Sequence, residues 1–331
     1  MLITVDCGTT NMRCRLFDGT ELLGETKEKC GCRNGVFDGS NDCMKDALKR
    51  GIATLLQRRN IEEKDVSAIL SSGVLASDLG IYYLPHAVAP AGPKESARAA
   101  ELVTMPEVCS IPILFIPGVK TLPRTEEKDS EGWIEKLESM SGEECETYGI
   151  AKLLGLTGDY VITLPGSYNK VIEVDGQGRI CSIRTGMCGE FIAAMSEHTL
   201  LKSFVPSPVI RTVIPEKLIC GWEYSCRHGV SHTLIKTRMV QLLGDWTEDE
   251  AANFFVGAIL RDDISSVAAL CADGRPAVVG GGNPLRQIFC VLLEHAGVQN
   301  LMTIDDAAAR IVSSLGAMEV LEAYRKENGL C

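Results

Sequence analysis

The sequence predicts an α/β protein built from two similar domains that face one another. The first observation is a repeated plan: strand, turn of small residues, strand, Asp-Gly turn and strand occur at the N-terminus and again over residues 160–186. The second is that helical apolar patterns follow each copy. The third is length, because 331 residues suffice for two medium-sized domains.

The first copy of this plan opens the N-terminal half. Residues 2–5 predict an apolar strand, residues 12–17 a second strand after a tight turn, and residues 21–26 a third strand after Asp18-Gly19. The rest of this half is expected to hold a Gly/Asn/Asp-rich loop at 31–40, a helix at 42–60, a strand at 67–71, a Pro-rich loop at 84–94 and a strand at 114–117.

The second copy follows a polar loop at residues 121–132, which we place near a domain boundary. A helix from residue 141 to about 154 leads into strands at 160–164 and 170–174 and a third strand ending near Arg184. Beyond it we expect helices at 191–203, 235–243 and 249–272, a strand at 277–279, and helices at 284–296 and 307–328. Gly329 is expected to end the last helix.

Composition narrows the class of protein. A hydrophobic content of 45% with 23% charged residues is typical of a globular protein, and the net charge of −11 argues against a nucleic-acid partner. No apolar run approaches the roughly 20 residues that span a bilayer, and Asp6 interrupts the only apolar start, so we expect no membrane association and a cytoplasmic location. The 14 cysteines include no Cys-x-x-Cys pair, and reduced buried thiols are the default expectation.

The first tight turn predicts a phosphate site. Asp6 ends the first strand and precedes Gly8, Thr9 and Thr10, whose backbone N–H and hydroxyl groups are unhindered donors. A carboxylate at this point can hold Mg²⁺ through water while the turn binds phosphate oxygens. No Gly-Lys-Ser/Thr follows, so this is not a Walker A loop; an ordinary β-hairpin remains the alternative.

A glycine run at residues 280–282 predicts a nucleotide contact. It follows the buried strand at 277–279 and allows a flat ligand such as adenine or ribose to approach the backbone closely. Asn283 is expected to cap the next helix, with Pro284 at its first position. A plain strand-to-helix turn is the alternative.

The segment Ser141-Gly142-Glu143-Glu144 predicts a helix start with one spare carboxylate. Ser141 and Glu144 have the Ser-x-x-Glu spacing of a capping box, which would give Glu144 a structural role. Glu143 then has no structural task and is a candidate general base toward a substrate hydroxyl.

Together these motifs resemble, in order, the 2-dehydro-3-deoxygalactonokinase family of the actin/hexokinase/Hsp70-like ATPase superfamily. The resemblance spans nearly the whole chain and is most specific over residues 141–190, with Gly-Glu-Glu, Pro-Gly-Ser-x-x-Lys and Met-x-Gly-Glu-Phe. It implies two actin-like (ribonuclease H-like) domains with an interdomain ATP cleft. The domains would comprise residues 1–122, with the helix at 307–331 packing back on them, and residues 123–306.

The resemblance also implies roles and an activity. Hexokinase-like relatives place their base where Glu143 stands, and Asp6 would anchor Mg²⁺. We expect ATP-dependent phosphorylation of the 6-hydroxyl of 2-dehydro-3-deoxy-D-galactonate; the oligomeric state stays open, with a homodimer as one candidate. The implied phosphate- and nucleotide-binding residues are Asp6, Gly8, Thr9, Thr10, Arg13, Gly166, Ser167, Lys170, Gly280, Gly281, Gly282 and Asn283, and the weaker substrate candidates are Arg184 and Glu190, with Arg124 and Lys170 as further donors to the substrate carboxylate.

The second loop departs from the family pattern. Tyr168 and Val171 replace a histidine and a tryptophan, and Cys188 replaces a threonine. Two alternatives therefore stay open: a kinase of the same superfamily acting on another sugar or acid, and a non-catalytic regulator that binds nucleotide.

Overall fold

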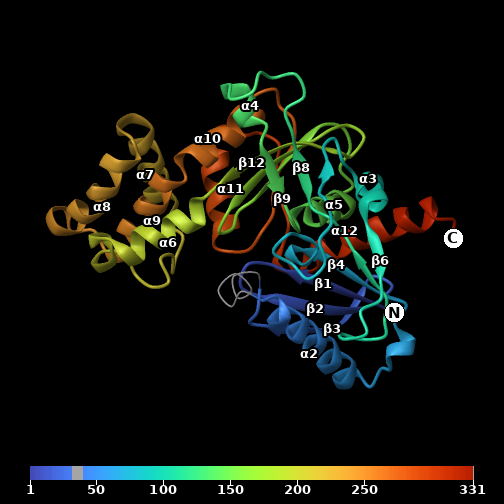
Figure 1. Cartoon of the computed structure of the whole chain (residues 1–331). Helices are drawn as coiled ribbons and strands as arrows, with labels where there is room; N and C mark the ends of the chain where they lie inside the picture. The colour runs from blue at the N-terminus through green and yellow to red at the C-terminus, as the bar shows by residue number, and fades with distance from the viewer. Residues whose placement is uncertain (32–39, 331) are drawn as a thin grey trace. The chain divides into compact units, whose positions relative to one another are not determined.

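The protein, described by a computed structural model over residues 1–31 and 40–330, forms two compact units (Figure 1). Unit 1 comprises Met1–Gly158, Val174–Ile183 and Arg310–Cys331, and unit 2 comprises Asp159–Glu173 and Arg184–Ala309. Apart from its first and last residues, the loop expected at 31–40 lies outside the described residues.

Unit 1 is built on a sheet with the strand order β3-β2-β1-β4-β7-β6. Strand β1 is antiparallel to β2 and parallel to β4, so the carboxyl ends of β1 and β4 lie side by side. The strands are β1 (Leu2–Cys7), β2 (Met12–Asp18), β3 (Glu21–Glu28), β4 (Ala68–Gly73), β6 (Glu101–Val103) and β7 (Ile113–Phe115). All of these strands were expected except β6.

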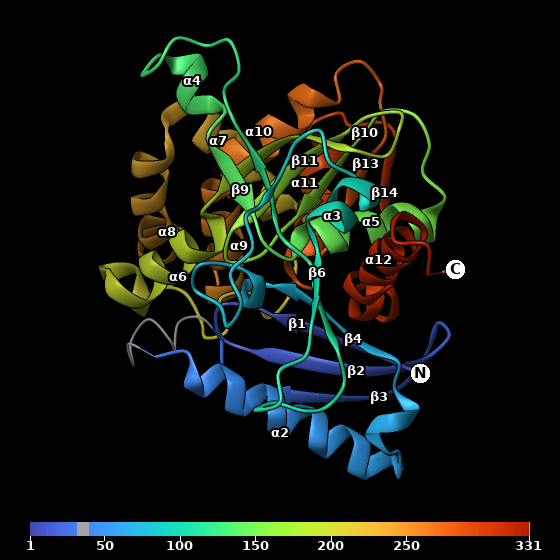
Figure 2. The same cartoon turned by 45° about the vertical axis from the view of Figure 1, so that its right-hand side comes forward.

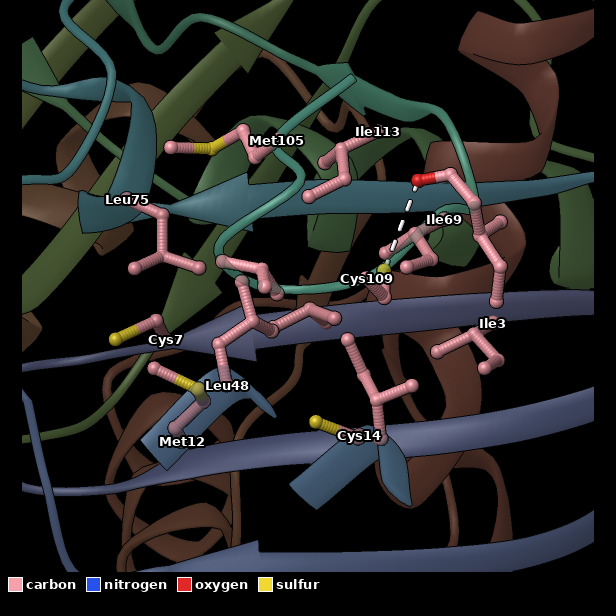
Figure 3. Packing of buried hydrophobic residues seen from close by; sticks show 14 of the residues in the cluster. Ile3, Cys7, Met12, Cys14, Leu48, Ile69, Leu75, Met105, Cys109 and Ile113 are labelled. Carbon is pink, nitrogen blue, oxygen red and sulfur yellow. Dashed lines mark hydrogen bonds between the residues drawn. The ribbon is translucent and has the colours of Figure 1, made fainter. Parts of the chain in front are cut away.

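Helices cover both faces of this sheet (Figure 2). The helix α2 (Asp42–Arg59) packs its apolar side on β2 and β3 and ends at Asn60 in a left-handed conformation. On the other face, α12 (Asp306–Glu327) is tied to β1 by a 2.7 Å hydrogen bond between the hydroxyls of Thr4 and Ser314. The face under α2 holds the buried core, in which Cys7, Met12 and Cys14 pack with aliphatic side chains (Figure 3).

The boundary between the units differs from the one expected after residue 122. In a small sheet of order β5-β8-β9, β8 (Val119–Thr121) pairs with β5 (Ala87–Val88) and β9 (Glu138–Met140). The helix α5 (Glu143–Leu154) then packs on α12 so closely that a Cβ on Gly149 would lie 1.8 Å from the Val312 carbonyl oxygen. A Cβ on Gly316 would lie equally close to the Cys145 carbonyl oxygen. Residues 123–158 are therefore held in unit 1.

Unit 2 repeats the strand order of unit 1. Its sheet runs β12-β11-β10-β13-β14, which matches β3-β2-β1-β4-β7 position by position. The strands are β10 (Tyr160–Leu164), β11 (Asn169–Val174), β12 (Ile180–Gly186), β13 (Ala277–Val279) and β14 (Leu301–Thr303). Val174–Ile183, which holds the end of β11 and the first part of β12, is counted with unit 1. The repeat seen in the sequence thus extends over a whole sheet.

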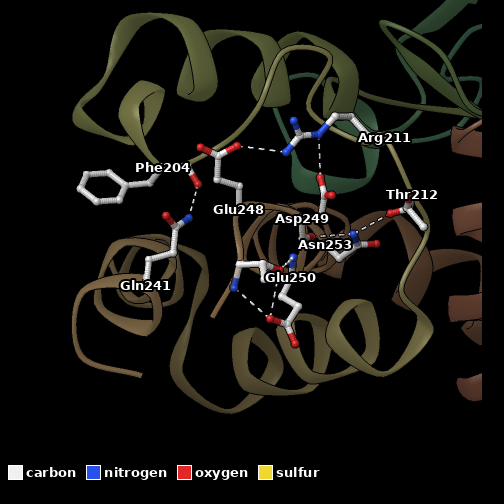
Figure 4. A network of polar contacts seen from close by, with 9 residues as sticks. Phe204, Arg211, Thr212, Gln241, Glu248, Asp249, Glu250 and Asn253 are labelled. Carbon is white, nitrogen blue, oxygen red and sulfur yellow. Dashed lines mark hydrogen bonds and ion pairs between the residues drawn. The ribbon is translucent and has the colours of Figure 1, made fainter. Parts of the chain in front are cut away.

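A set of helices lies between β12 and β13. The members are α6 (Cys188–His198), η3 (Leu200–Ser203), α7 (Pro215–His228), α8 (Val230–Gly244), α9 (Glu248–Ile259) and α10 (Arg261–Leu270), and α11 (Leu285–His295) follows β13. The segment before α7 is fixed to α9 by ion pairs from Arg211 to Glu248 and Asp249 at 3.0 and 2.8 Å, and Asn253 donates to the Thr212 carbonyl at 2.9 Å (Figure 4).

Several helices differ from expectation. The single helix expected at 249–272 is broken at Leu260 into α9 and α10, and α7 was not expected. The loop expected at 84–94 contains β5 and the start of α3 (Pro93–Ala99), and the loop at 121–132 reaches α4 (Glu131–Glu135). Short helices η1 (Glu63–Asp65) and η2 (Val74–Ala76) flank β4.

Two expectations about environment concern absences. Over residues 1–31 and 40–330, no helix has both the length and the apolar character needed to cross a bilayer. The cysteines in this part of the chain are free thiols, many of them buried.

Candidate active site

The first turn of unit 1 is exposed, but one of its expected donors, the Gly8 amide, is occupied within the turn. Gly8, Thr9 and Thr10 are exposed, and the Gly8 amide donates to the Asn11 carbonyl at 3.0 Å to close the turn between β1 and β2. Gly31 lies directly behind this turn, since a Cβ there would lie 2.4 Å from the Gly8 carbonyl oxygen. The backbone of Gly31 therefore packs directly against the turn, and a side chain at residue 31 would not fit there.

Asp6 stands at the end of β1, opposite Arg13 on β2 and beside Ser72 on β4. Its carboxylate lies 3.7 Å from the Arg13 guanidinium, and both side chains are partly exposed. No group of three His, Cys, Asp or Glu side chains in the described residues could hold a metal by itself. A single exposed carboxylate beside a phosphate-type turn does fit Mg²⁺, which commonly takes one or two carboxylates plus substrate phosphates.

Helix α5 begins against the ends of these strands. Gly142, its N-cap, has φ of +114°, and a Cβ on it would lie 3.2 Å from the Gly73 Cα. Gly73 packs against β1, since a Cβ on Gly73 would lie 2.3 Å from the Cys7 carbonyl oxygen. These two glycines place Glu143, the first residue of α5, close to the carboxyl ends of β1 and β4, and hence to the Asp6 turn.

The expected capping box between Ser141 and Glu144 is wrong. The Ser141 hydroxyl forms a 3.0 Å hydrogen bond with Nε2 of His86, a residue distant in the sequence, instead of one with an amide of α5. Glu143, half-buried, accepts the Ser141 amide at 3.0 Å, and Glu144 accepts the Gly142 amide at 2.8 Å. Both carboxylates thus hold backbone amides at the helix start.

Glu144 differs sharply from its neighbour in environment. Its side chain is completely buried, and its Oε1 has no hydrogen-bond partner among the described residues. Burial, together with the charge of Glu143, raises the pKa of Glu144 to about 8 against the opposing effect of backbone amides. At neutral pH, Glu144 is therefore mostly a neutral carboxylic acid.

The second turn, in unit 2, connects β10 to β11 and exposes Ser167. A Cβ on Gly189 would lie 2.3 Å from the Gly166 carbonyl oxygen, and the Glu190 amide donates to the Ser167 carbonyl at 3.0 Å. The N-terminal turn of α6 therefore packs on this loop, which explains why the Met-x-Gly-Glu-Phe and Pro-Gly-Ser motifs occur together.

Buried side chains support the second turn. The Thr163 hydroxyl donates to Asn169 Oδ1 at 2.9 Å, and Asn169 Nδ2 donates to Asp263 Oδ1 at 2.8 Å. Lys170, nearly buried, donates to the Thr185 hydroxyl at 2.8 Å. Sequence reasoning placed Asn169 only as the end of the second phosphate loop and missed Thr185 and Asp263; their polarity was the available signal.

The glycine run lies against this turn within unit 2. The Gly280 amide donates to the Thr163 carbonyl at 2.9 Å, and a Cβ on Gly281 would lie 2.7 Å from the Pro165 carbonyl oxygen. Gly281 also has a left-handed φ of +71°, and Gly282 has open space around it. The structure thus brings Gly166, Ser167 and Lys170 together with Gly280 and Gly281.

Asn283 does not cap α11 as expected. The helix begins at Leu285, and Asn283 Nδ2 donates to Asp306 at 3.3 Å. Asp306 also pairs with buried Arg286, whose guanidinium donates to the Gly281 carbonyl at 2.8 Å. The Asn283 side chain thus bonds to Asp306 and not to the first amides of α11.

The weaker substrate candidates have other partners. Exposed Arg184 donates to Ser266 on α10 at 2.7 Å, and Arg124 donates to the Ala89 carbonyl at 2.8 Å. Glu190 borders a cavity of about 1030 Å³ between α6 and α8, together with Asp262 and Asp263. Its lining contains these carboxylates and no Lys, Arg or His, so it suits an uncharged group better than an acid.

The sequence pattern of the 2-keto-3-deoxy-galactonokinase family matches residues 6–314. The chain belongs to this family. It is 22% identical over 307 residues to the 2-dehydro-3-deoxygalactonokinase of Escherichia coli (strain K12), covering 92% of this chain and 94% of that protein.

Solved structures confirm the predicted fold class. A Sinorhizobium meliloti protein, described as a candidate 2-dehydro-3-deoxygalactonokinase, is similar with a TM-score of 0.75 at 19% identity, covering 98% of this chain and 99% of that one. Component A of the (R)-2-hydroxyglutaryl-CoA dehydratase of Acidaminococcus fermentans is similar with a TM-score of 0.52 at 16% identity, covering 98% of each chain. The mixed α/β fold is thus shared with kinases of this family.

Proposed function

We propose that this member of the family transfers the γ-phosphoryl group of ATP to the 6-hydroxyl of 2-dehydro-3-deoxy-D-galactonate. The observation that supports the proposal is the packing of Cys7, Gly73 and Gly142, which brings the start of α5, where Glu143 stands, to the carboxyl ends of β1 and β4. A base next to a phosphate-type turn is what phosphoryl transfer to an alcohol requires.

Each unit has its own set of residues with a role in this proposal. Unit 2 binds the adenosine at Gly280–Gly282 and phosphate oxygens at the second turn, where Gly281 already touches Pro165. Unit 1 contributes the first turn and Glu143, which takes the proton of the attacking hydroxyl. Mg²⁺, held through water at Asp6, would neutralise charge on the phosphates. A nucleotide substrate and free buried thiols both support a cytoplasmic location.

The departures from the family pattern fall on two kinds of position. Val171 is buried in the core of unit 2 and Cys188 is buried under the second turn, so both change packing. Tyr168 is 42% exposed next to Ser167, where it can touch a ligand. We therefore expect any change in substrate preference to trace to Tyr168.

An assay of ATP consumption tests the function. The chain should phosphorylate 2-dehydro-3-deoxy-D-galactonate, with the phosphate on the 6-hydroxyl by NMR, and should prefer it to a panel of related sugars and acids. Preference for another acid supports a related kinase, and ATP binding without turnover of any acceptor supports a non-catalytic regulator. The homodimer stays a prediction that light scattering can test.

Replacing Glu143 tests the base. Glu143→Gln keeps the shape and an acceptor for the Ser141 amide but cannot take a proton, so kcat should fall by about 10²–10⁴ with KM little changed. Glu146→Gln on the same helix is the matched control and should retain nearly full activity. A fully active Glu143→Gln variant would exclude Glu143 as the base.

A further inference from the structure

The buried carboxyl group of Glu144 has no role in the proposed reaction, yet it lies directly behind the residue that does. It points into unit 1 from the second residue of α5 and is completely buried. One oxygen accepts the amide of Gly142, and the other has no hydrogen-bond partner among the described residues. A buried ion with one partner would be costly, whereas a neutral acid at this position is tolerable.

Within the described residues, the groups that shift the pKa of Glu144 most include no positively charged side chain. Burial and the charge of Glu143 raise its pKa, and the backbone amides of Glu144 itself and of Gly142, together with the Cys145 thiol, oppose them. A negative charge on Glu144 would raise the pKa of the Cys145 thiol, which is also affected by Asp6 of β1 and Ser72 of β4. The same charge would raise the pKa of the buried Tyr148 hydroxyl, which is also affected by Glu95 of α3.

We propose that Glu144 is a positioning residue: it stays a neutral carboxylic acid in the folded protein and fixes the Gly142 turn, and with it Glu143, at the ends of β1 and β4. The assignment of Glu143 as the group being positioned rests on the proposed function. The hydrogen bond by which Glu144 holds the Gly142 amide does not rest on the proposed function, because both residues lie within unit 1.

Neutrality matters because the Glu144 carboxyl is the side chain that accepts the amide of Gly142. Gly142 has a φ of +114°, a conformation that favours glycine, and lies close to Gly73, so the turn is closely packed. Ionisation would put a second buried negative charge next to Glu143. The turn would then open or the unit would lose stability, and in either case Glu143 would leave its place.

The sign of the pH effect follows from the raised pKa of Glu144. The folded protein binds this proton more tightly than the unfolded chain, so the stabilisation is fully present below the ordinary glutamate range and is lost as pH rises through about 8. Glu144→Gln keeps an acceptor for the Gly142 amide and removes the ionisation. The melting temperature of this variant should therefore gain on that of the parent protein as pH rises.

The experiment compares the parent chain, Glu144→Gln and Glu146→Gln between about pH 5 and pH 9. As pH rises from about 5 to about 9, melting temperature and kcat should decline less in the Glu144→Gln variant than in the parent, while the Glu146→Gln control should follow the parent. Equal pH slopes in the parent and Glu144→Gln overturn the proposal. A loss of kcat in Glu144→Gln as large as in Glu143→Gln overturns it too, because Glu144 would then be the base.

A second measurement needs neither a variant nor kinase activity. Carbonyl-¹³C serine with ¹⁵N glycine selects the Ser141–Gly142 and Ser72–Gly73 amides in an NMR spectrum. The Gly142 amide should titrate with a midpoint near pH 8 in the parent, following Glu144. A Gly142 amide that does not move up to pH 9, or that moves equally in Glu144→Gln, overturns the proposal even in a chain that phosphorylates nothing.

Discussion

The two turns of the repeated strand plan share one device and differ in another. Each is backed by a glycine from the segment after its third strand: Gly31 behind the first turn, and Gly189 behind the second. Gly31 follows Gly8 by the same number of residues as Gly189 follows Gly166. The spacing thus preserves a backbone contact, which is a stricter sign of duplication than the strand pattern.

The difference lies in the side chains. The second turn is supported by hydrogen bonds from buried Thr163 through buried Asn169 to partly buried Asp263, whereas the polar groups of the first turn are exposed and Asp6 pairs with Arg13 at 3.7 Å. Buried hydrogen bonds fix a loop before any ligand binds, and exposed ones do not. The second turn is therefore preorganised, while the first turn depends on what binds to it.

The largest expected effect comes from removing the one charge that the first turn offers to a metal. Asp6→Asn should lower kcat by about 100-fold or more, because the metal chiefly stabilises charge during transfer. The gain in melting temperature produced by Mg²⁺ on top of ATP should also shrink. Asp18→Asn, at the exposed turn between β2 and β3, is the control. Unchanged turnover would reduce Asp6 to a turn former.

The shared glycine contacts predict a smaller effect, on stability. Gly31→Ala and Gly189→Ala each put a methyl group within 2.4 Å of a carbonyl oxygen of the turn, so each should cost roughly 1–3 kcal/mol of unfolding free energy. Both should weaken stabilisation by ATP. For the unfolding free energy alone, Gly8→Ala is the control, since its Cβ meets nothing closer than 3.9 Å. If only one of the pair is destabilising, the two turns are not built alike.

The smallest expected effect concerns the support unique to the second turn. Burial, opposed by the hydrogen bond from Asn169, raises the pKa of Asp263, so the folded state binds its proton more tightly than the unfolded chain. Its contribution to stability is lost as pH rises above the ordinary aspartate range. Asp263→Asn should thus change stability by about 1 kcal/mol or less and gain on the parent with rising pH. A large loss at every pH would show that the charge itself supports the turn.

Local pattern predicted the strands and turns because their chemistry is written in neighbouring residues. Alternating apolar residues, Asp-Gly pairs and small-residue turns specify β1–β3 and β10–β12 without any distant partner. The glycine contacts at residues 31, 73, 142 and 189 could not be predicted in this way. Each depends on a backbone from another part of the fold.

Two copies of one sequence signature show where local reasoning fails. Thr247 and Glu250 have the Ser/Thr-x-x-Glu spacing and do form a capping box, with bonds of 3.3 and 2.9 Å in the two directions. Ser141 and Glu144 have the same spacing and do not. The Ser141 hydroxyl is hydrogen-bonded to His86, and the Glu144 side chain is buried in the interior of unit 1. The deciding partners lie outside the signature, so only the fold separates the cases.

The contact of Gly149 with Gly316 has a consequence for the order in which the chain folds. Unit 1 includes residues 310–331, so α5 and Thr4 wait for partners that are synthesised long after them. At ordinary rates of translation the delay is on the order of ten seconds or more. During that time unit 2 can form while the sheet of unit 1 keeps one face open. We therefore expect the nascent chain to depend on chaperones until α12 emerges from the ribosome.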